Sequence, residues 1–548
     1  MLESTKPVGN IAHVALLTLF FAAGAAAQAP TASQSSASAK QSCTVTRSVP
    51  TDADRALARR DFATADTLYR AQLAAAGTDT ARAAANTGIV RTQLAAGKLN
   101  DALATIKKAM AESPSSAQLQ DVLGEVYFRR GEPFEAAGAW NTAQHIDFCN
   151  PRVHYDIARF QRLNGNYASE QKQLDLAHRL APDDRMYSRA VAPRVQMTVE
   201  ERVARLTDRL ENENLSTEDR ESLQRSLDVV RAQSKGSCEI VHPMDSTKIP
   251  IVPISNGPTD MYGIGLDLQL NGKKKRFQID TGASGLLISR SVAASAGLIS
   301  EAESRGGGLG DSGPVKELLA HVDSLRIGQL EFHNCLVRVF DKKNVLDVDG
   351  LISTDVFSAW LVTLDIPSRE VRLNPLPKRP DDDARPSELD TAGQGENAET
   401  IPRDRYIAPE MKDWTQVFRY GHDLIFPTLI GKTAASKLFI MDTGASRTLI
   451  SPAAAKEVTG VGGSEARVKG ISGQVKDVSE ADSVDIVFAK VRSPLRNILA
   501  VDTSGLGRGS GVEISGLIGF ETLRQLVITI DYRDNLVHIV YDPTHGFH

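Results

Sequence analysis

The chain has 548 residues, which is too long for a single hydrophobic core and predicts about three or four domains. Its 41% hydrophobic and 24% charged residues are ordinary for a globular protein. A formal net charge of -5, with no segment dominated by Lys and Arg, argues against nucleic-acid binding. The 11 His and 4 Cys form no metal-binding motif, so neither a metal nor another cofactor is expected.

The amino terminus is typical of an export signal. Lys6 precedes an apolar stretch, Ile11 to Phe21, and Ala25-Ala26-Ala27 provides a small-residue cleavage site before Gln28. The apolar stretch is short for a transmembrane helix, and this argues against the alternative of an uncleaved membrane anchor. We therefore predict a signal peptide over residues 1–27 and an exported protein, periplasmic or secreted, with no stable membrane span after cleavage.

The four cysteines become important if the chain is exported, because disulfides persist in oxidising compartments. Cys43, Cys149, Cys238 and Cys335 allow three complete pairings, and the sequence does not choose among them. Cys149 and Cys335 fit equally well as small buried residues.

A helical repeat follows a short linker. Residues 28–50 are rich in Ser, Ala, Gln and Thr and predict a flexible segment. Within residues 51–184, glycines recur 34 residues apart, and each is followed twelve residues later by an alanine. These pairs are Gly97 with Ala109, Gly131 with Ala143, and Gly165 with Ala177.

This spacing resembles a tetratricopeptide array, with a fourth, degenerate unit near Ala53. We expect the glycines and alanines to let two helices cross closely within each repeat. The resemblance implies a concave surface for a peptide or partner protein and no chemistry of its own. An unrelated helical bundle is the alternative.

Beyond the repeats the pattern changes from helical to alternating. The predicted segments, in chain order, are a helical connector over 185–245, a first β lobe over 246–375, an acidic Pro-rich linker over 376–412 and a second β lobe over 413–548. The sequence thus predicts a multidomain chain, an all-α repeat region followed by two all-β lobes.

The two β lobes are copies of one unit. Each contains the pentapeptide Asp-Thr-Gly-Ala-Ser between two apolar strands, beginning at Asp280 and at Asp442. A Gly-rich stretch follows in each lobe, then Gly-Leu-Ile at Gly350 and at Gly516. The Gly-rich stretches are Gly306–Gly313 and Gly470–Gly473. Because the features recur in one order, duplication explains them and coincidence does not.

The residue types fit one kind of chemistry. Two carboxylates about 3 Å apart cannot both ionise, so they share a proton and supply a base and an acid together. Gly282 and Gly444 would let the two loops approach without a Cβ between them. The hydroxyls of Thr281 and Thr443 can form hydrogen bonds across the pseudo-twofold axis.

These motifs resemble the retropepsin-like branch of the aspartic peptidases, over roughly residues 250–375 and 415–543. The resemblance implies that Asp280 and Asp442 are a catalytic dyad, supported by the Thr and Gly of each loop, and that the Gly-rich stretches are flaps. It implies hydrolysis of a peptide or protein substrate. The first lobe departs from the family pattern at Ser353, where a supporting Gly is expected, so close packing there is in question.

Ala283 and Ala445 follow the two Asp-Thr-Gly triplets, where pepsin-like relatives carry a hydroxyl that bonds to the carboxylate. Without that hydroxyl we expect a less depressed upper pKa and activity at mildly acidic to near-neutral pH. Two alternatives stay open from sequence. The fold could have lost turnover and serve as a peptide-binding or scaffold protein, and the lobes could pair between two chains.

Overall fold

A computed structural model describes residues 43, 49–191, 199–213, 215–236, 238–255, 257, 261–340, 348–380, 403–433, 435–507 and 510–542. The predicted signal peptide, nearly all of the 28–50 linker and the middle of the 376–412 linker lie outside these residues. Within them, no helix combines the length and the apolar character needed to cross a membrane. The repeats and both β lobes belong to one compact unit, residues 45–548.

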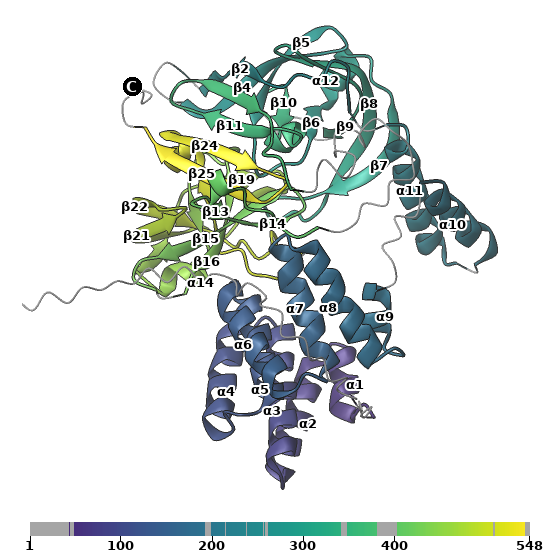
Figure 1. The fold of residues 1–548 in the computed structure, drawn as a ribbon, viewed down its shortest axis with the longest axis vertical. Coiled ribbons are helices and arrows are strands. Elements are labelled where there is room, and N and C mark those ends of the chain that lie inside the picture. Colours follow the sequence, from purple (N-terminus) through teal and green to yellow (C-terminus); the bar gives the residue numbers. More distant parts are fainter. Residues whose placement is uncertain are drawn as a thin grey trace, which may run out of the picture. The chain divides into compact units, whose positions relative to one another are not determined.

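The amino-terminal region is helical, and its helices pair in sequence order (Figure 1). The pairs are α1 (Asp52–Ala58) with α2 (Phe62–Ala75), α3 (Asp79–Ala95) with α4 (Leu99–Glu112), α5 (Ala117–Arg129) with α6 (Pro133–Ile146), and α7 (Pro151–Leu163) with α8 (Tyr167–Leu180). A short helix, α9 (Arg185–Val191), follows α8. The predicted alanines pack between helices, since Ala109, Ala143 and Ala177 are all buried.

The repeat glycines have a different role from the one predicted. Gly97, Gly131 and Gly165 lie in the turn inside each pair with φ of 75°, 70° and 76°, a conformation that glycine adopts without strain. Space for helix crossing is instead provided by Gly88 and Gly124. A Cβ on Gly88 would lie 2.3 Å from the Tyr69 ring, and one on Gly124 would lie 2.4 Å from the Trp140 ring. The expectation that the 34-residue glycines permit the crossing was therefore wrong.

The degenerate first unit shows why its repeat was hard to recognise. Arg60, with φ of 62°, occupies the turn between α1 and α2 where later units have glycine. Its amide donates to the Leu57 carbonyl, as the Gly97 amide donates to that of Leu94. The backbone thus keeps the turn although the side chain is unfavourable there.

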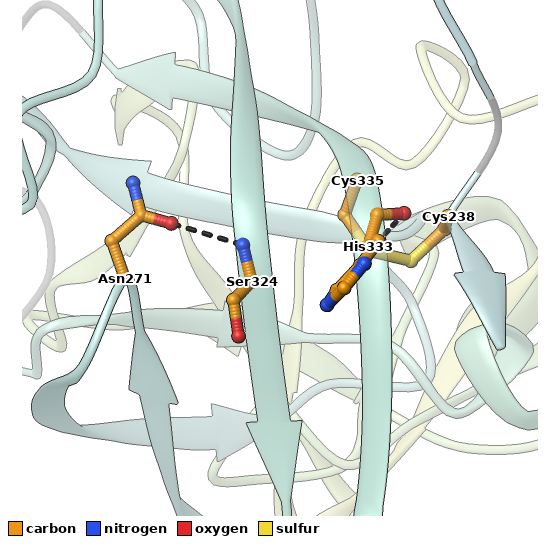
Figure 2. The surroundings of a disulfide bond; sticks show 5 residues. All are labelled: Cys238, Asn271, Ser324, His333 and Cys335. Carbon is orange, nitrogen blue, oxygen red and sulfur yellow. Dashed lines mark hydrogen bonds between the residues drawn. A yellow bond between two sulfur atoms is a disulfide. The ribbon is translucent and has the colours of Figure 1, made fainter. Parts of the chain in front are cut away.

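A hairpin of two helices, α10 (Val199–Asn212) and α11 (Thr217–Gln233), precedes the first lobe. Ser216 caps α11 by accepting from the Asp219 amide. After α11, a disulfide joins Cys238 to Cys335, and β1 (Glu239–Ile240) pairs with β9 (Leu330–Phe340) beside it (Figure 2). Cys335 is buried and bonded, so it is not the free core residue that was one alternative.

The disulfide closes a loop with a sequence separation of 97, and its removal has a calculable cost. Loss of a cross-link over a loop of this size costs about 4.7 kcal/mol through the entropy of the unfolded chain. We expect Cys238→Ala together with Cys335→Ala to lower the free energy of unfolding by about that amount, measured in urea. An unchanged unfolding midpoint would show that the hairpin is held by packing alone.

The first lobe is built on a mixed sheet with the order β1-β9-β6-β10-β5-β4-β8-β7. Its elements are β2 (Thr247–Pro250), β3 (Val252–Ser255), β4 (Met261–Leu270), β5 (Lys273–Ile279), β6 (Leu286–Ser289), α12 (Arg290–Ser295), β7 (Ser300–Gly306), β8 (Val315–Ile327), β10 (Gly350–Ile352), η1 (Thr354–Phe357), β11 (Leu361–Asp365) and β12 (Glu370–Asn374).

The second lobe repeats this plan in the order β14-β15-β16-β23-β17-β22-β21-β18. Its elements are η3 (Pro409–Met411), β13 (Thr415–Gln416), β14 (Phe418–Tyr420), β15 (Asp423–Ile430), β16 (Lys437–Asp442), β17 (Leu449–Ile450), α14 (Pro452–Lys456), β18 (Val461–Gly463), β19 (Val468–Gly470), β20 (Gly473–Val475), β21 (Ser479–Phe488), β22 (Val491–Ala500), β23 (Gly516–Gly519), α15 (Phe520–Leu523), β24 (Leu526–Asp531) and β25 (Leu536–Tyr541).

A third sheet joins the two lobes of the same chain. Its order is β13-β25-β24-β11-β12-β2, so each lobe contributes its last two strands. The lobes meet where β11 and β24 pair antiparallel, with the hydroxyls of Thr363 and Thr529 3.0 Å apart at the junction. In this structure the lobes therefore close on each other within one chain.

The repeats share a hydrophobic core with the second lobe. Phe128, Trp140 and Val153 of the repeats belong to the same buried cluster as Ile440 and Leu517 of the β16 and β23 strands. Around this cluster lie buried charges. The Lys437 ammonium is 2.7 Å from Glu132 and 3.2 Å from Glu457. The repeats are therefore part of the packing behind the strand that ends in Asp442.

Candidate active site

Two equivalent strand ends bring the Asp-Thr-Gly loops together. β5 runs parallel to β10 and leads into Asp280, while β16 runs parallel to β23 and ends at Asp442. In each lobe the Gly-Leu-Ile strand thus lies directly beside the strand that positions the Asp. This places all six predicted site residues around one point between the lobes.

The two threonines interlock the loops. The Thr281 hydroxyl donates to the Met441 carbonyl at 2.7 Å and accepts from the Thr443 amide at 3.1 Å. The Thr443 hydroxyl donates to the Ile279 carbonyl at 2.8 Å and accepts from the Thr281 amide at 3.1 Å. Both side chains are fully buried, so these four hydrogen bonds fix the position of each loop against the other.

The two glycines set how near the loops come. A Cβ on Gly282 would lie 2.9 Å from Cγ of Asp442, and one on Gly444 would lie 2.4 Å from Cγ of Asp280. Any side chain at either position would push the opposite carboxyl away. Glycine is therefore required here for close approach of the backbone to the opposite carboxyl.

The two carboxyl groups are buried, and the pKa of each is raised. Asp280 accepts from the Gly282 amide at 2.9 Å, and Asp442 accepts from the amides of Gly444 and Ala445, both at 2.9 Å. Burial, followed by the neighbouring Asp442 charge, raises the pKa of Asp280 well above its usual range. Burial also raises the pKa of Asp442, although these amides and the Asp280 carboxyl stabilise its anion. Both directions favour a state in which the two carboxyls carry one proton between them.

Two residues that the sequence analysis missed support the loops from outside the motif. The His422 Nε2 donates to the Gly282 carbonyl at 3.1 Å, and the Gln278 amide donates to the Gly444 carbonyl at 3.3 Å. Beside His422, burial raises the pKa of Asp423 to about 6. Because these contacts cross between lobes, no local pattern in the sequence could have identified them.

The flap tips lie against one another. The hairpin formed by β7 and β8 and the hairpin formed by β19 and β20 meet where the Ser312 amide donates to the Ser472 carbonyl at 2.8 Å. The Ser472 amide donates to the Leu309 carbonyl at 3.0 Å, and the Gly308 amide donates to the Ser472 hydroxyl at 3.1 Å. The two Gly-rich stretches are thus hairpin tips, as predicted, and each tip holds the other.

Ser353 is accommodated without disturbing the first lobe. It is buried, and its hydroxyl accepts from the Asp355 amide at 3.2 Å as the cap of η1. The equivalent Gly519 has no such space, because a Cβ there would lie 2.2 Å from the Arg447 carbonyl oxygen. The two lobes therefore differ locally at this position, and serine fits the first.

Among the described residues, one acidic cluster has the spacing of a metal site, and it lies in the repeats. Asp121, Glu125 and Asp156 place carboxylate oxygens within 4.8 Å of one another. Arg91 and Arg152 form ion pairs with this cluster at 2.6–3.1 Å, so its charge is already compensated. The cluster is more consistent with an ion-pair network than with a cation site.

Comparison with known proteins identifies similar families for both regions. Residues 266–356 match a family model described as aspartyl protease. A retropepsin-like aspartic protease from Rickettsia conorii is 19% identical and covers 25% of this chain and 97% of its own, with a TM-score of 0.18. The aspartic proteinase of Irpex lacteus is 11% identical and covers 54% of this chain and 98% of its own, with a TM-score of 0.30.

The helical region has its own similar structure. A thermophilic TPR protein from Thermus thermophilus is 21% identical and covers 33% of this chain and 95% of its own, with a TM-score of 0.25. No curated protein sequence matches the chain. The chain is similar to aspartyl proteases over residues 266–356, and its structural neighbours include a retropepsin-like aspartic protease, an aspartic proteinase and a TPR protein.

Proposed function

We propose that this chain is an aspartic endopeptidase that hydrolyses peptide bonds with Asp280 and Asp442. The observation that carries the proposal is the pair of buried carboxyls held between loops that the two threonines interlock. A protease-type fold alone would not imply turnover, because function depends on the site. Here the loops, the threonine hydrogen bonds and the two close glycines are all present.

In this mechanism Asp442 is the base, since its anion accepts from two backbone amides and from Asp280. Asp442 removes a proton from a water molecule, and the oxygen of that water bonds to the peptide carbonyl carbon. At the same time Asp280 protonates the carbonyl oxygen. Asp442 then gives its proton to the amide nitrogen, and a hydroxyl of the intermediate returns one to Asp280 as the C–N bond breaks. The products are a carboxylic acid and an amine, and the dyad again holds one proton.

The walls beside the dyad are largely apolar. Ile471, at the tip of the second flap, packs with Ala283 and Phe340 of the first lobe. Leu309, at the tip of the first flap, packs with Ala445 and Leu499 of the second lobe. We therefore expect substrates with large apolar side chains near the scissile bond, because such side chains would replace these contacts when the flaps open.

The pH range of cleavage follows from the raised pKa values. The dyad works with one proton, and burial keeps that proton bound above the usual Asp pKa of about 3.9. We expect kcat/KM to be highest between about pH 4 and 7 and to fall as pH rises through the upper pKa. A maximum below pH 3 would contradict this.

The same shift affects stability in a defined direction. The folded state binds these protons more tightly than the unfolded state. The contribution of the pair to the free energy of unfolding is therefore complete below the pKa of the unfolded chain, and it is lost as pH rises through the higher pKa of the folded protein. In Asp280→Asn this loss should be smaller, which thermal unfolding between pH 4 and 8 will show.

The direct test of the proposed function is cleavage of an unfolded protein or a peptide library, with inhibition by a statine-type mimic of the transition state. Cleavage that the mimic abolishes supports the peptidase. Peptide binding without cleavage under any of these conditions would favour the inactive scaffold instead.

We also propose that the chain is exported, to the periplasm or by secretion. The amino-terminal pattern and the Cys238–Cys335 disulfide support this, because disulfides are rare in reducing compartments. Fractionation of cells that express the full chain should recover a protein beginning at Gln28 outside the cytoplasm. Recovery of the uncleaved chain in the cytoplasm would contradict it.

The repeats provide a candidate surface for a substrate or partner protein. A cavity of about 320 Å³ is lined by the first helices of four successive units, including Arg91, Arg129, Arg152 and Arg159. Glu125 of the acidic cluster also lines this cavity, and burial raises the pKa of Asp121 in the same cluster well above its usual range. Positive charge is therefore in excess, and we propose that the cavity receives an acidic segment of the partner.

Arg129 gives the sharpest test of this docking surface, because no described carboxylate forms an ion pair with it. Arg129→Gln should weaken binding of a labelled Glu-rich peptide several-fold and reduce its dependence on salt. Arg70→Gln, on the exposed side of α2, is the matched control. Equal binding by both variants would rule out the cavity as the acidic-segment site.

A further inference from the structure

The two lobes differ at one place on the face that carries the catalytic loops. In the first lobe, Leu287 is the register partner of Arg338, and Phe340 is the register partner of Glu317. Directly paired residues place their side chains on the same face of a sheet. Leu287 and Phe340 belong to the cluster that contains Ala283 and the flap-tip residue Ile471. Arg338 and Glu317 therefore lie on the wall of the site.

In the second lobe, the positions equivalent to Arg338 and Glu317 hold apolar residues. Leu449 lies seven residues after Asp442, as Leu287 lies seven after Asp280, and its register partner is Leu499. Leu499 pairs in turn with Glu480, so the position equivalent to Glu317 is Val478. Leu499 and Val478 both pack in the apolar cluster around Ala445. An Arg and a Glu in one lobe thus replace a Leu and a Val in the other.

The first lobe is adapted to hold this pair. The Glu317 side chain is only 3% exposed and lies under the base of the flap, where a Cβ on Gly306 would meet its carboxyl oxygen at 2.0 Å. Arg338 is 30% exposed, and its guanidinium donates to the carbonyl of Ser284 in the catalytic pentapeptide. The two charged groups are 3.8 Å apart, which is too long for a hydrogen bond.

The charges point to the class of side chain that would bind. Glu317 is too deeply buried to reach a substrate, whereas Arg338 extends to the surface with N–H groups to spare. Burial raises the pKa of Glu317, so in mildly acidic solution less negative charge opposes the guanidinium. Arginine binds a carboxylate through two parallel hydrogen bonds when geometry allows.

We propose that Arg338, held by Ser284 and Glu317, forms a polar subsite on the first lobe that selects a substrate with a Glu or Asp side chain at one position beside the scissile bond. The subsite rests on the proposed peptidase function. The equivalent subsite of the second lobe, lined by Leu499 and Val478, takes an apolar side chain. The enzyme would thus distinguish the two directions of a substrate by charge.

The test compares matched peptides that differ only by Glu, Gln or Leu at each position near the cleaved bond. For the wild type we expect one position at which kcat/KM is about tenfold or more higher with Glu than with Leu. Arg338→Leu with Glu317→Val copies the second lobe and should lower this ratio at least tenfold. Arg326→Leu with Glu331→Val removes an exposed ion pair of the same β8–β9 hairpin and should leave the ratio unchanged.

The outcomes separate this inference from the proposed function. If no position prefers Glu, or if the double variant keeps the wild-type ratio, the subsite is wrong while the peptidase stands. If the wild type cleaves nothing, the same peptides are titrated against it by fluorescence anisotropy, and the Glu to Leu ratio of Kd decides. Should the double variant fail to fold, Arg338→Met alone replaces it, because methionine keeps much of the packing volume.

Discussion

Replacing Asp280 or Asp442 with Asn should each lower kcat for peptide cleavage by about 10²- to 10⁴-fold, the range for loss of a positioned acid or base. Asn keeps the size of the side chain but cannot hold or release the proton. In the proposed mechanism one site uses both residues, so the double variant should be little worse than either single variant. Initial rates with a quenched fluorescent peptide measure all three.

These substitutions should leave the fold intact, which makes the result easy to interpret. Both carboxyls are buried and have raised pKa values, so removing their charge also removes a desolvation cost. Thermal unfolding should therefore show no loss of stability near pH 7. Asp477→Asn, at an exposed position of the second lobe, is the control. Substantial activity in either single variant would mean that the two carboxyls do not work as one dyad.

Lys437→Ala should lower the free energy of unfolding by about 1.5 to 3 kcal/mol, because buried Glu132 loses one of its two cationic partners and keeps only Arg130. Lys437 begins the strand that ends in Asp442, and the loss should be transmitted to activity through poorer positioning of that carboxyl. Urea unfolding and kcat on a short peptide measure the two effects. Lys432→Ala, in the exposed turn before this strand, should change neither.

The same interface changes what deletion of the repeats should do. If residues 51–184 only recruited substrate, their removal would impair cleavage of a protein far more than of a short peptide. The shared core around Ile440 and Leu517 leads us to expect loss of both activities, since deletion exposes apolar surface behind the strand that ends in Asp442. Unimpaired cleavage of a short peptide by the deletion variant would show that the second lobe folds alone.

The motif was predictable because its information is local. Asp280, Thr281 and Gly282 are adjacent in sequence, and their duplication at Asp442 implied that the loops meet. The repeats were predictable because their 34-residue period can be recognised in the sequence without the structure. Even there, the same glycines served a turn and not a helix crossing, because the period shows where a glycine lies and not which backbone angle it adopts.

Contacts between distant segments were not predictable. Lys437 reads as an ordinary charged residue at the start of a strand, and only packing against Glu132 makes it a buried charge. His422 likewise contacts Gly282, which lies more than a hundred residues away in the sequence, and Glu317 pairs with Phe340 on the facing strand. Such contacts depend on how the lobes and repeats pack, and no short sequence pattern encodes that.

The measurement that bears most directly on the central claim is titration of peptide cleavage with a tight-binding statine-type inhibitor at known protein concentration. One dyad per chain requires that cleavage fall linearly to zero at one equivalent of inhibitor per chain, and that Asp442→Asn lose this stoichiometric binding. An end point at half an equivalent would contradict one competent dyad in every chain. Cleavage that persists under saturating inhibitor would contradict the aspartic dyad itself.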